Sequence, residues 1–260
     1  MAYEKVLYEV VDQVAVIRLN EPATLNAMSV QMGEELLHAL RRAPNEARAI
    51  VLGSVGRAFC SGANLGEGGF DITDPDRDVG AKLDGILNPV VYQMRLAEVP
   101  VITAVNGAAV GVGCGFALAG DLIIAGQGAY FYQAFAKVGL SPDGGSSYLL
   151  TKAVGRVRAM ELMLLGSKLP APQALDWGLI NRVVPDEEVD GAALALARQL
   201  GQGPRSLGII KDMAWRALDS TLETALMSER IAQRRAGRTD DFAEGVNAFR
   251  EKRPLVFRGR

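Results

Sequence analysis

Strand-like and helix-like segments alternate along this chain up to residue 185, and only helix-like segments follow. Short apolar runs, such as residues 49–52 and 101–105, are separated by segments with apolar residues at helical spacing, such as residues 29–42. This alternation is typical of a sheet whose strands are connected by helices. The sequence therefore predicts an α/β core with a C-terminal helical region.

A second constraint is the segment of residues 99–120, which contains no charged residue. The segment is long enough to cross a membrane. However, Pro100, the pair Asn106-Gly107 and several further glycines interrupt it, and such residues end or bend helices. We therefore predict a buried strand, a tight turn and a buried helix here, and no membrane association.

The composition argues against several classes of protein. With 28 basic and 30 acidic residues, the chain lacks the basic excess that is typical of nucleic-acid and membrane-surface proteins. Two cysteines, Cys60 and Cys114, and one histidine, His38, are too few for a disulfide framework or a metal cluster. The N-terminal residues are charged and lack the apolar run of a signal peptide, so we expect a cytoplasmic protein.

Two segments rich in small residues are the main candidates for a binding site, namely residues 58–65 and 105–115. In each, an apolar strand runs into residues that let a ligand approach the backbone, and in the second a helix begins there. Free N–H groups at a helix N-terminus suit an oxyanion or a phosphate. Tight packing of backbone on backbone needs the same small residues, so spacing alone leaves both interpretations open.

In this order and at this separation, the two segments resemble the two oxyanion-hole motifs of the crotonase (enoyl-CoA hydratase/isomerase) superfamily. The similarity extends through nearly the whole chain, including residues 155–161 and 244–254. It implies a crotonase-like α/β fold of repeated ββα units. Residues 1–195 would form the core with the CoA and active sites, and residues 196–260 would form a helical oligomerisation region. A homotrimer or a dimer of trimers is the expected assembly.

The resemblance also implies roles for individual residues. The backbone N–H groups of Ala63 and Val112 would hold the thioester oxygen of an acyl-CoA substrate, and no separate cofactor or metal is expected. Many family members have glycine in place of Val112, so its side chain would reshape the acyl pocket. Lys252 would approach the CoA of a neighbouring subunit, although a solvated helix end is an equally good interpretation. The other residues implied in binding are Ala58, Phe59, Ser61, Gly62, Asn64, Leu65, Gly111 and Phe135.

The chemistry after the enolate depends on which carboxylates are present. Hydratases of this family use two glutamates, and the motifs place these positions at Gly115 and Phe135, neither of which can act as an acid or base. One acidic residue remains, Asp143. Pro142-Asp143-Gly144 is a favourable turn sequence, which makes a purely structural Asp143 a strong alternative.

The segment of residues 139–145 is nevertheless similar to the active-site turn of Δ3,Δ2-enoyl-CoA isomerases and of the ring-epoxide isomerases of phenylacetate degradation. The leading hypothesis is therefore an enoyl-CoA isomerase in which Asp143 transfers a proton and Phe135 excludes water. The first alternative is a hydratase or another enolate reaction, such as thioester hydrolysis or dehalogenation. The second is a CoA-thioester-binding protein without catalytic activity.

Overall fold

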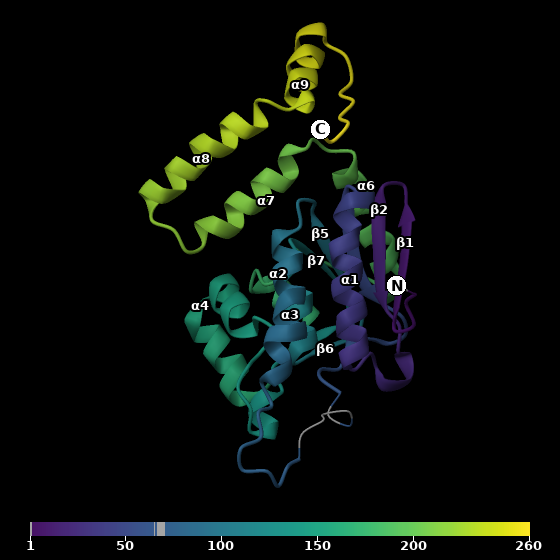
Figure 1. Cartoon of the computed structure of the whole chain (residues 1–260), viewed down its shortest axis with the longest axis vertical. Coiled ribbons are helices and arrows are strands. Elements are labelled where there is room, and N and C mark those ends of the chain that lie inside the picture. Colours follow the sequence, from purple (N-terminus) through teal and green to yellow (C-terminus); the bar gives the residue numbers. More distant parts are fainter. Residues whose placement is uncertain (1, 65, 67–70) are drawn as a thin grey trace.

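The computed structural model describes residues 2–64, 66 and 71–260. The larger of its two sheets consists of β1 (Val6–Val11), β2 (Val14–Leu19), β3 (Ala49–Ser54), β5 (Val101–Val105), β7 (Leu122–Gly126) and β10 (Arg182–Val184). These strands lie side by side in this order (Figure 1). β1 and β2 form an antiparallel hairpin, and all other neighbours are parallel.

The smaller sheet contains four three-residue strands in the order β4 (Ala58–Cys60), β6 (Ala108–Val110), β8 (Tyr130–Tyr132) and β9 (Lys168–Pro170). β4, β6 and β8 are parallel, and β9 is antiparallel to β8. The sequence predicts β8, whose three residues are all aromatic and favour strands, but not β4, β6 or β9, which lack such a signal. These strands depend on pairing partners that are distant in the sequence.

The helices lie where the sequence predicts them, with small differences at their ends. α1 continues past residue 42 to Glu46, although Pro44 lies in its last turn. Gly155, with φ of 76°, interrupts α4 at the position where the sequence predicts a break between two helices. The helices are α1 (Val30–Glu46), α2 (Asn88–Leu96), α3 (Val112–Leu118), α4 (Ser146–Leu165), α5 (Ala171–Asp176), α6 (Val189–Gly201), α7 (Ser206–Ala217), α8 (Leu222–Ala236) and α9 (Asp240–Glu251).

The larger sheet is buried on both faces, which explains why its central strands are almost entirely apolar. Along β2, Val14 and Val16 pack in the cluster that contains α6, whereas Ala15 and Ile17 pack in the cluster that contains α1. Successive side chains of a strand point to opposite faces, so each strand serves both layers. The active-site segments therefore extend from a sheet that is held rigidly between helices.

Local sequence signals account for the first elements of the fold. Asp12 and Gln13 both adopt positive φ, as the two-residue turn of a hairpin requires. Ser29 caps α1, because its hydroxyl oxygen accepts a hydrogen bond of 3.1 Å from the backbone N–H of Met32. These contacts involve neighbours in the sequence, which is why both elements are predictable.

The uncharged segment of residues 99–120 folds as predicted into buried structure. It supplies β5, β6 and α3, and every residue of α3 is buried. Within the described part of the chain, no helix is both long enough and apolar enough to cross a membrane.

The last helices project from the α/β core. In Figure 1, α8 lies beyond α7 as seen from the core, and α9 forms the upper end of the molecule. Both helices expose large apolar side chains, among them Leu222, Leu226, Met227, Ile231, Phe242 and Phe249. Such a surface is unusual for a helix that faces only water.

Candidate active site

The two segments singled out in the sequence are brought together by the pairing of β4 with β6. Ala58 pairs with Ala108 and Cys60 with Ala109. α3 then packs directly on β4, since a Cβ on Gly113 would lie 2.6 Å from the Cβ of Cys60. The small residues therefore do allow backbone to pack on backbone, which is one of the two interpretations that the spacing left open. The same packing positions the two turns that carry Ala63 and Val112.

The loop that leads into β4 is braced by Asn26, a residue to which no sequence motif points. Its side chain is fully buried and donates hydrogen bonds to the carbonyls of Val55 (2.9 Å) and Ala58 (2.8 Å). Its Oδ1 accepts a bond of 2.7 Å from the N–H of Glu21. Asn26 has φ of 54°, and asparagine tolerates this conformation better than most residues. No local pattern points to Asn26, because its partners are up to 32 residues away.

The backbone N–H of Ala63 points away from Met28, the residue with which Ala63 forms a bridge. Ala63 forms a parallel bridge with Met28, in which the N–H of Met28 donates to the carbonyl of Gly62 (2.7 Å) and the N–H of Asn64 donates to the carbonyl of Met28 (3.0 Å). In such a bridge the central residue directs its own N–H to the opposite side. No hydrogen bond among the described residues uses this donor.

Val112 is the first residue of α3, so its N–H is one of the donors that a helix leaves without an internal acceptor. Gly111 precedes it with φ of 55° and is anchored by a bond of 2.9 Å from its N–H to the carbonyl of Tyr132. A Cβ on Gly111 would lie 3.8 Å from the Cα of Gly62. The two turns that carry the N–H groups of Ala63 and Val112 are therefore in contact.

Asp143 lies in a tight turn that rests on the same helix end. The N–H of Ser146 donates to the carbonyl of Asp143 (3.0 Å), and Gly144 and Gly145 have φ of 57° and 75°. Glycine adopts left-handed conformations at a lower cost than any other residue. A Cβ on Gly144 would lie 2.9 Å from Cγ2 of Val112. The structure thus brings two of the predicted site residues, Val112 and Asp143, to one place.

The environment of the Asp143 carboxyl group is unusual for an aspartate. Its Oδ1 is buried and has no hydrogen-bond partner in the described part of the chain. Burial raises the pKa of Asp143 from 3.8 to about 6, because the charged form loses hydration without gaining a donor. The ring of Phe135 lies beside Gly111, since its Cζ would be 3.6 Å from a Cβ on that glycine.

Comparison with known proteins shows the family to which the chain belongs. A family model described as enoyl-CoA hydratase/isomerase matches residues 9–260. The chain belongs to the enoyl-CoA hydratase/isomerase family. A 1,2-epoxyphenylacetyl-CoA isomerase of Escherichia coli K12 is 42% identical over 260 residues, covering 99% of each chain. A protein of Rhodobacter capsulatus named a probable enoyl-CoA hydratase is 41% identical over 265 residues, covering 100% of each.

Solved structures support the same assignment. A Mycobacterium abscessus protein of the enoyl-CoA hydratase/isomerase group superposes with a TM-score of 0.93 at 36% identity, covering 98% of this chain and 100% of the other. An enoyl-CoA hydratase from Bacillus anthracis gives a TM-score of 0.90 at 26% identity, covering 99% and 100%. The predicted crotonase-like α/β fold is therefore confirmed.

Several residues implied by the crotonase resemblance lie apart from this site. Lys252 ends α9, at the far end of the molecule, so within a single chain it does not reach Asp143 (Figure 1). The side chains of Ala58 and Phe59 are buried in the core, which leaves only their backbone for ligand contacts. Ser61 and Asn64 are half-buried beside Ala63, whereas Leu65 lies outside the described residues.

The two cysteines have no part in the chemistry of this crotonase site. Both are fully buried. Burial raises the pKa of each thiol to about 12, although Cys114 lies in the first turn of α3. Neither thiol would ionise near neutral pH, and ionisation is what makes a cysteine nucleophilic. Within the described residues, no group of three acidic, cysteine or histidine side chains could hold a metal ion.

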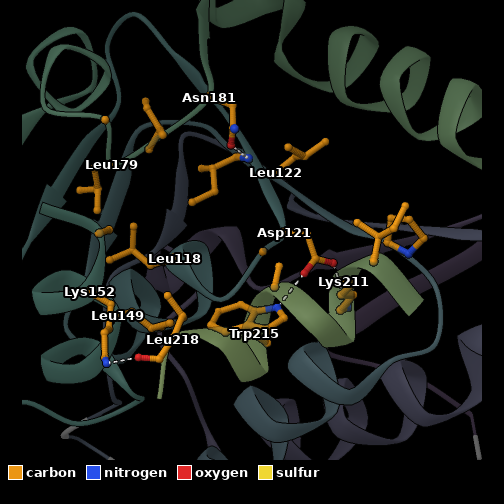
Figure 2. Close-up of a pocket in the computed structure, with 18 of the residues that line it drawn as sticks. Leu118, Asp121, Leu122, Leu149, Lys152, Leu179, Asn181, Lys211, Trp215 and Leu218 are labelled. Carbon is orange, nitrogen blue, oxygen red and sulfur yellow. Dashed lines mark hydrogen bonds and ion pairs between the residues drawn. The ribbon is translucent and has the colours of Figure 1, made fainter. Parts of the chain in front are cut away.

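A cavity of about 510 Å³ lies elsewhere, between the α/β core and α7 (Figure 2). Its walls are mainly leucine and isoleucine side chains, and none of the predicted site residues lines it. At its edge Asp121 accepts hydrogen bonds from Lys211 Nζ (2.8 Å) and Trp215 Nε1 (3.0 Å). Burial lowers the pKa of Lys211, and the charge of Asp121 opposes this effect. This network attaches α7 to the core.

Proposed function

We propose that this chain is an enoyl-CoA isomerase that moves a double bond of an unsaturated acyl-CoA. The observation that carries the proposal is a single partly buried carboxyl group, Asp143, in the turn that rests on Val112. Two N–H groups for which the described residues supply no acceptor lie on the adjoining turns, at Ala63 and Val112. One carboxylate beside such donors is enough for a proton shift next to a thioester.

The two N–H groups would stabilise the negative charge of the intermediate. Removing a proton from C2 of a thioester moves charge onto its carbonyl oxygen. Preorganised backbone donors in a site that excludes water stabilise this oxyanion more than they stabilise the neutral carbonyl. In addition, Val112 begins a helix, and the partial positive charge at a helix N-terminus favours an anion.

Asp143 would carry the proton in both steps. As a carboxylate it removes the C2 proton of a 3-enoyl-CoA, and the C–H electrons form a dienolate with its charge on the thioester oxygen. The carboxylic acid so formed then returns the proton to C4, which leaves the double bond between C2 and C3. A pKa of about 6 suits this cycle, because the base form predominates at neutral pH and remains basic enough to accept the proton.

The residues at the two hydratase positions support isomerisation over hydration. Gly115 offers no acid or base, and its surroundings are filled by the Asp143 turn. Phe135 is buried beside Gly111 and presents only an aromatic ring. The names of the relatives do not decide the question, since one is an isomerase and another a probable hydratase. The proposal rests on the side chains of this chain.

Two assays test the proposed reaction. A 3-enoyl-CoA should be converted to the conjugated 2-enoyl-CoA, which is detected by the ultraviolet absorbance of the conjugated thioester. A 2-enoyl-CoA should undergo hydration at a rate lower by at least about 100-fold, because no second carboxylate activates water. Hydration as fast as isomerisation would contradict the proposal. Binding of acyl-CoA without either reaction would favour a binding protein that lacks activity.

We further propose that the helical region after residue 195 joins copies of this chain into a trimer or a dimer of trimers. The exposed apolar side chains of α8 and α9 support this assembly, because water would otherwise cover them at a cost of about 25 cal/mol for each Å². Sedimentation equilibrium should give a mass of three or six chains. A monomer at micromolar concentration would contradict the proposal.

A further inference from the structure

Gly115 lies where α3 meets the turn that carries Asp143. It is buried in the middle of the helix. A Cβ at this position would overlap the carbonyl oxygen of Gly144 and lie 2.9 Å from its carbonyl carbon and 3.1 Å from Oγ of Ser146. The first two of these atoms belong to the backbone, so they cannot rotate away as the end of a flexible side chain can. A side chain at position 115 would therefore require the turn to move.

The same turn is in contact with α3 at a second point. Val112 and Gly115 are three residues apart, so they share one face of the helix. Gly144 lies against the side chain of Val112, and its carbonyl group lies in the space next to Gly115. The left-handed conformations of Gly144 and Gly145 leave the turn little freedom to adjust. The contacts of Gly144 with Val112 and with Gly115 thus determine where the adjacent Asp143 lies relative to α3.

We infer that Gly115 is a positioning residue, whose missing side chain allows the Asp143 turn to seat against α3 and so fixes where the Asp143 carboxyl group lies. This inference rests on the proposed isomerase function. Beyond that function, we infer that residue 115 controls the position of the acid–base residue Asp143, although residue 115 itself carries no reactive group. A side chain at position 115 and the present position of Asp143 exclude each other.

The substitution Gly115→Ala tests this inference. We expect kcat for the 3-enoyl-CoA to fall by at least about 100-fold, because a displacement of about 1 Å of a reacting group can have this effect. The dissociation constant of a saturated acyl-CoA should change by less than about threefold, because the two backbone N–H groups remain. Gly191→Ala is the matched control: it also adds a methyl group to a helix, but nothing lies within 4 Å of the new Cβ.

A second measurement separates positioning from general damage to the fold. If the turn is displaced outward, the Asp143 carboxyl regains water, and its pKa moves from about 6 towards the ordinary 3.8. NMR titration of ¹³C-labelled aspartate follows this change and needs no turnover. An unchanged titration of Asp143 together with unchanged kcat in Gly115→Ala would overturn the inference. Inactive wild-type protein would instead contradict the proposed function, while the titration would still test the role of Gly115.

Should Gly115→Ala fail to fold, Val112→Ala tests the other contact between the Asp143 turn and α3. It removes Cγ2, on which Gly144 rests, and keeps the backbone N–H. A loss of about tenfold in kcat is expected, with a lowered Asp143 pKa, since the turn loses one of its two supports. If neither quantity changes in Val112→Ala, the turn does not depend on its contacts with α3 and the inference is wrong.

Discussion

Asp143→Asn should lower kcat for double-bond migration by about 10⁴-fold, the upper end of the range for general acid–base catalysis. The loss is large because a single carboxyl group would perform both proton transfers, and an amide can perform neither. Asparagine has the same shape and also favours turns, so the backbone of the Asp143 turn should persist. The measurement is the rate of conjugated product formation with saturating 3-enoyl-CoA, together with the dissociation constant of a saturated acyl-CoA, which should stay nearly constant.

The pH dependence of the same pair of proteins provides the control. The pKa of Asp143 is raised in the folded state, from 3.8 to about 6, so the folded protein binds this proton more tightly than the unfolded chain. Wild-type kcat/KM should therefore fall about tenfold for each unit of pH below 6. The contribution of Asp143 to the free energy of unfolding should also decrease as pH rises from 4 to 6, by up to about 3 kcal/mol.

Asp143→Asn should lack both effects and should be more stable than the wild type at pH 7, with the difference disappearing below pH 4. A variant that is inactive because it is misfolded would be less stable instead. Isomerase activity near the wild-type level in Asp143→Asn would remove this residue from the mechanism and leave only its role in the turn.

Val112→Pro should lower kcat by about 10²–10³-fold, the usual cost of losing one donor to an oxyanion. Proline is tolerated at this position, because Val112 is the first residue of α3, and it removes the N–H together with the Cγ2 on which Gly144 rests. The N–H of Val112 has no acceptor in the described part of the chain, so folding should not depend on it. Steady-state kinetics with the 3-enoyl-CoA, supported by circular dichroism for the fold, provide the measurement.

Val112→Ala separates the donor from the side chain, because it shortens the side chain and keeps the N–H. The proline variant should be slower than the alanine variant by at least about tenfold, and this difference reports the contribution of the donor. Equal rates for the two variants would mean that the N–H of Val112 does not contact the developing charge. The proposed oxyanion site would then have to be placed elsewhere.

Most of the regular structure follows from patterns that neighbouring residues create. The hairpin turn at Asp12-Gln13, the cap at Ser29 and the helix break at Gly155 each depend on contacts within a few residues. The three strands β4, β6 and β9 do not, since each has only three residues and forms through pairing with distant partners. The role of Asn26 was not predictable from the sequence for the same reason, because its hydrogen bonds join segments about 30 residues apart.

The amino-acid sequence by itself determined the α/β alternation, the buried uncharged segment and the choice of residues at the site, including the absence of glutamate at 115 and 135. Its motifs also placed the chain in its family. The structure adds that the Asp143 turn rests against the first turn of α3 through Gly144, that the Asp143 carboxyl is buried enough to raise its pKa, and that Gly115 leaves room for this turn. The physical reason is that burial and close contact depend on all surrounding elements, whereas local patterns record only the preferences of neighbouring residues.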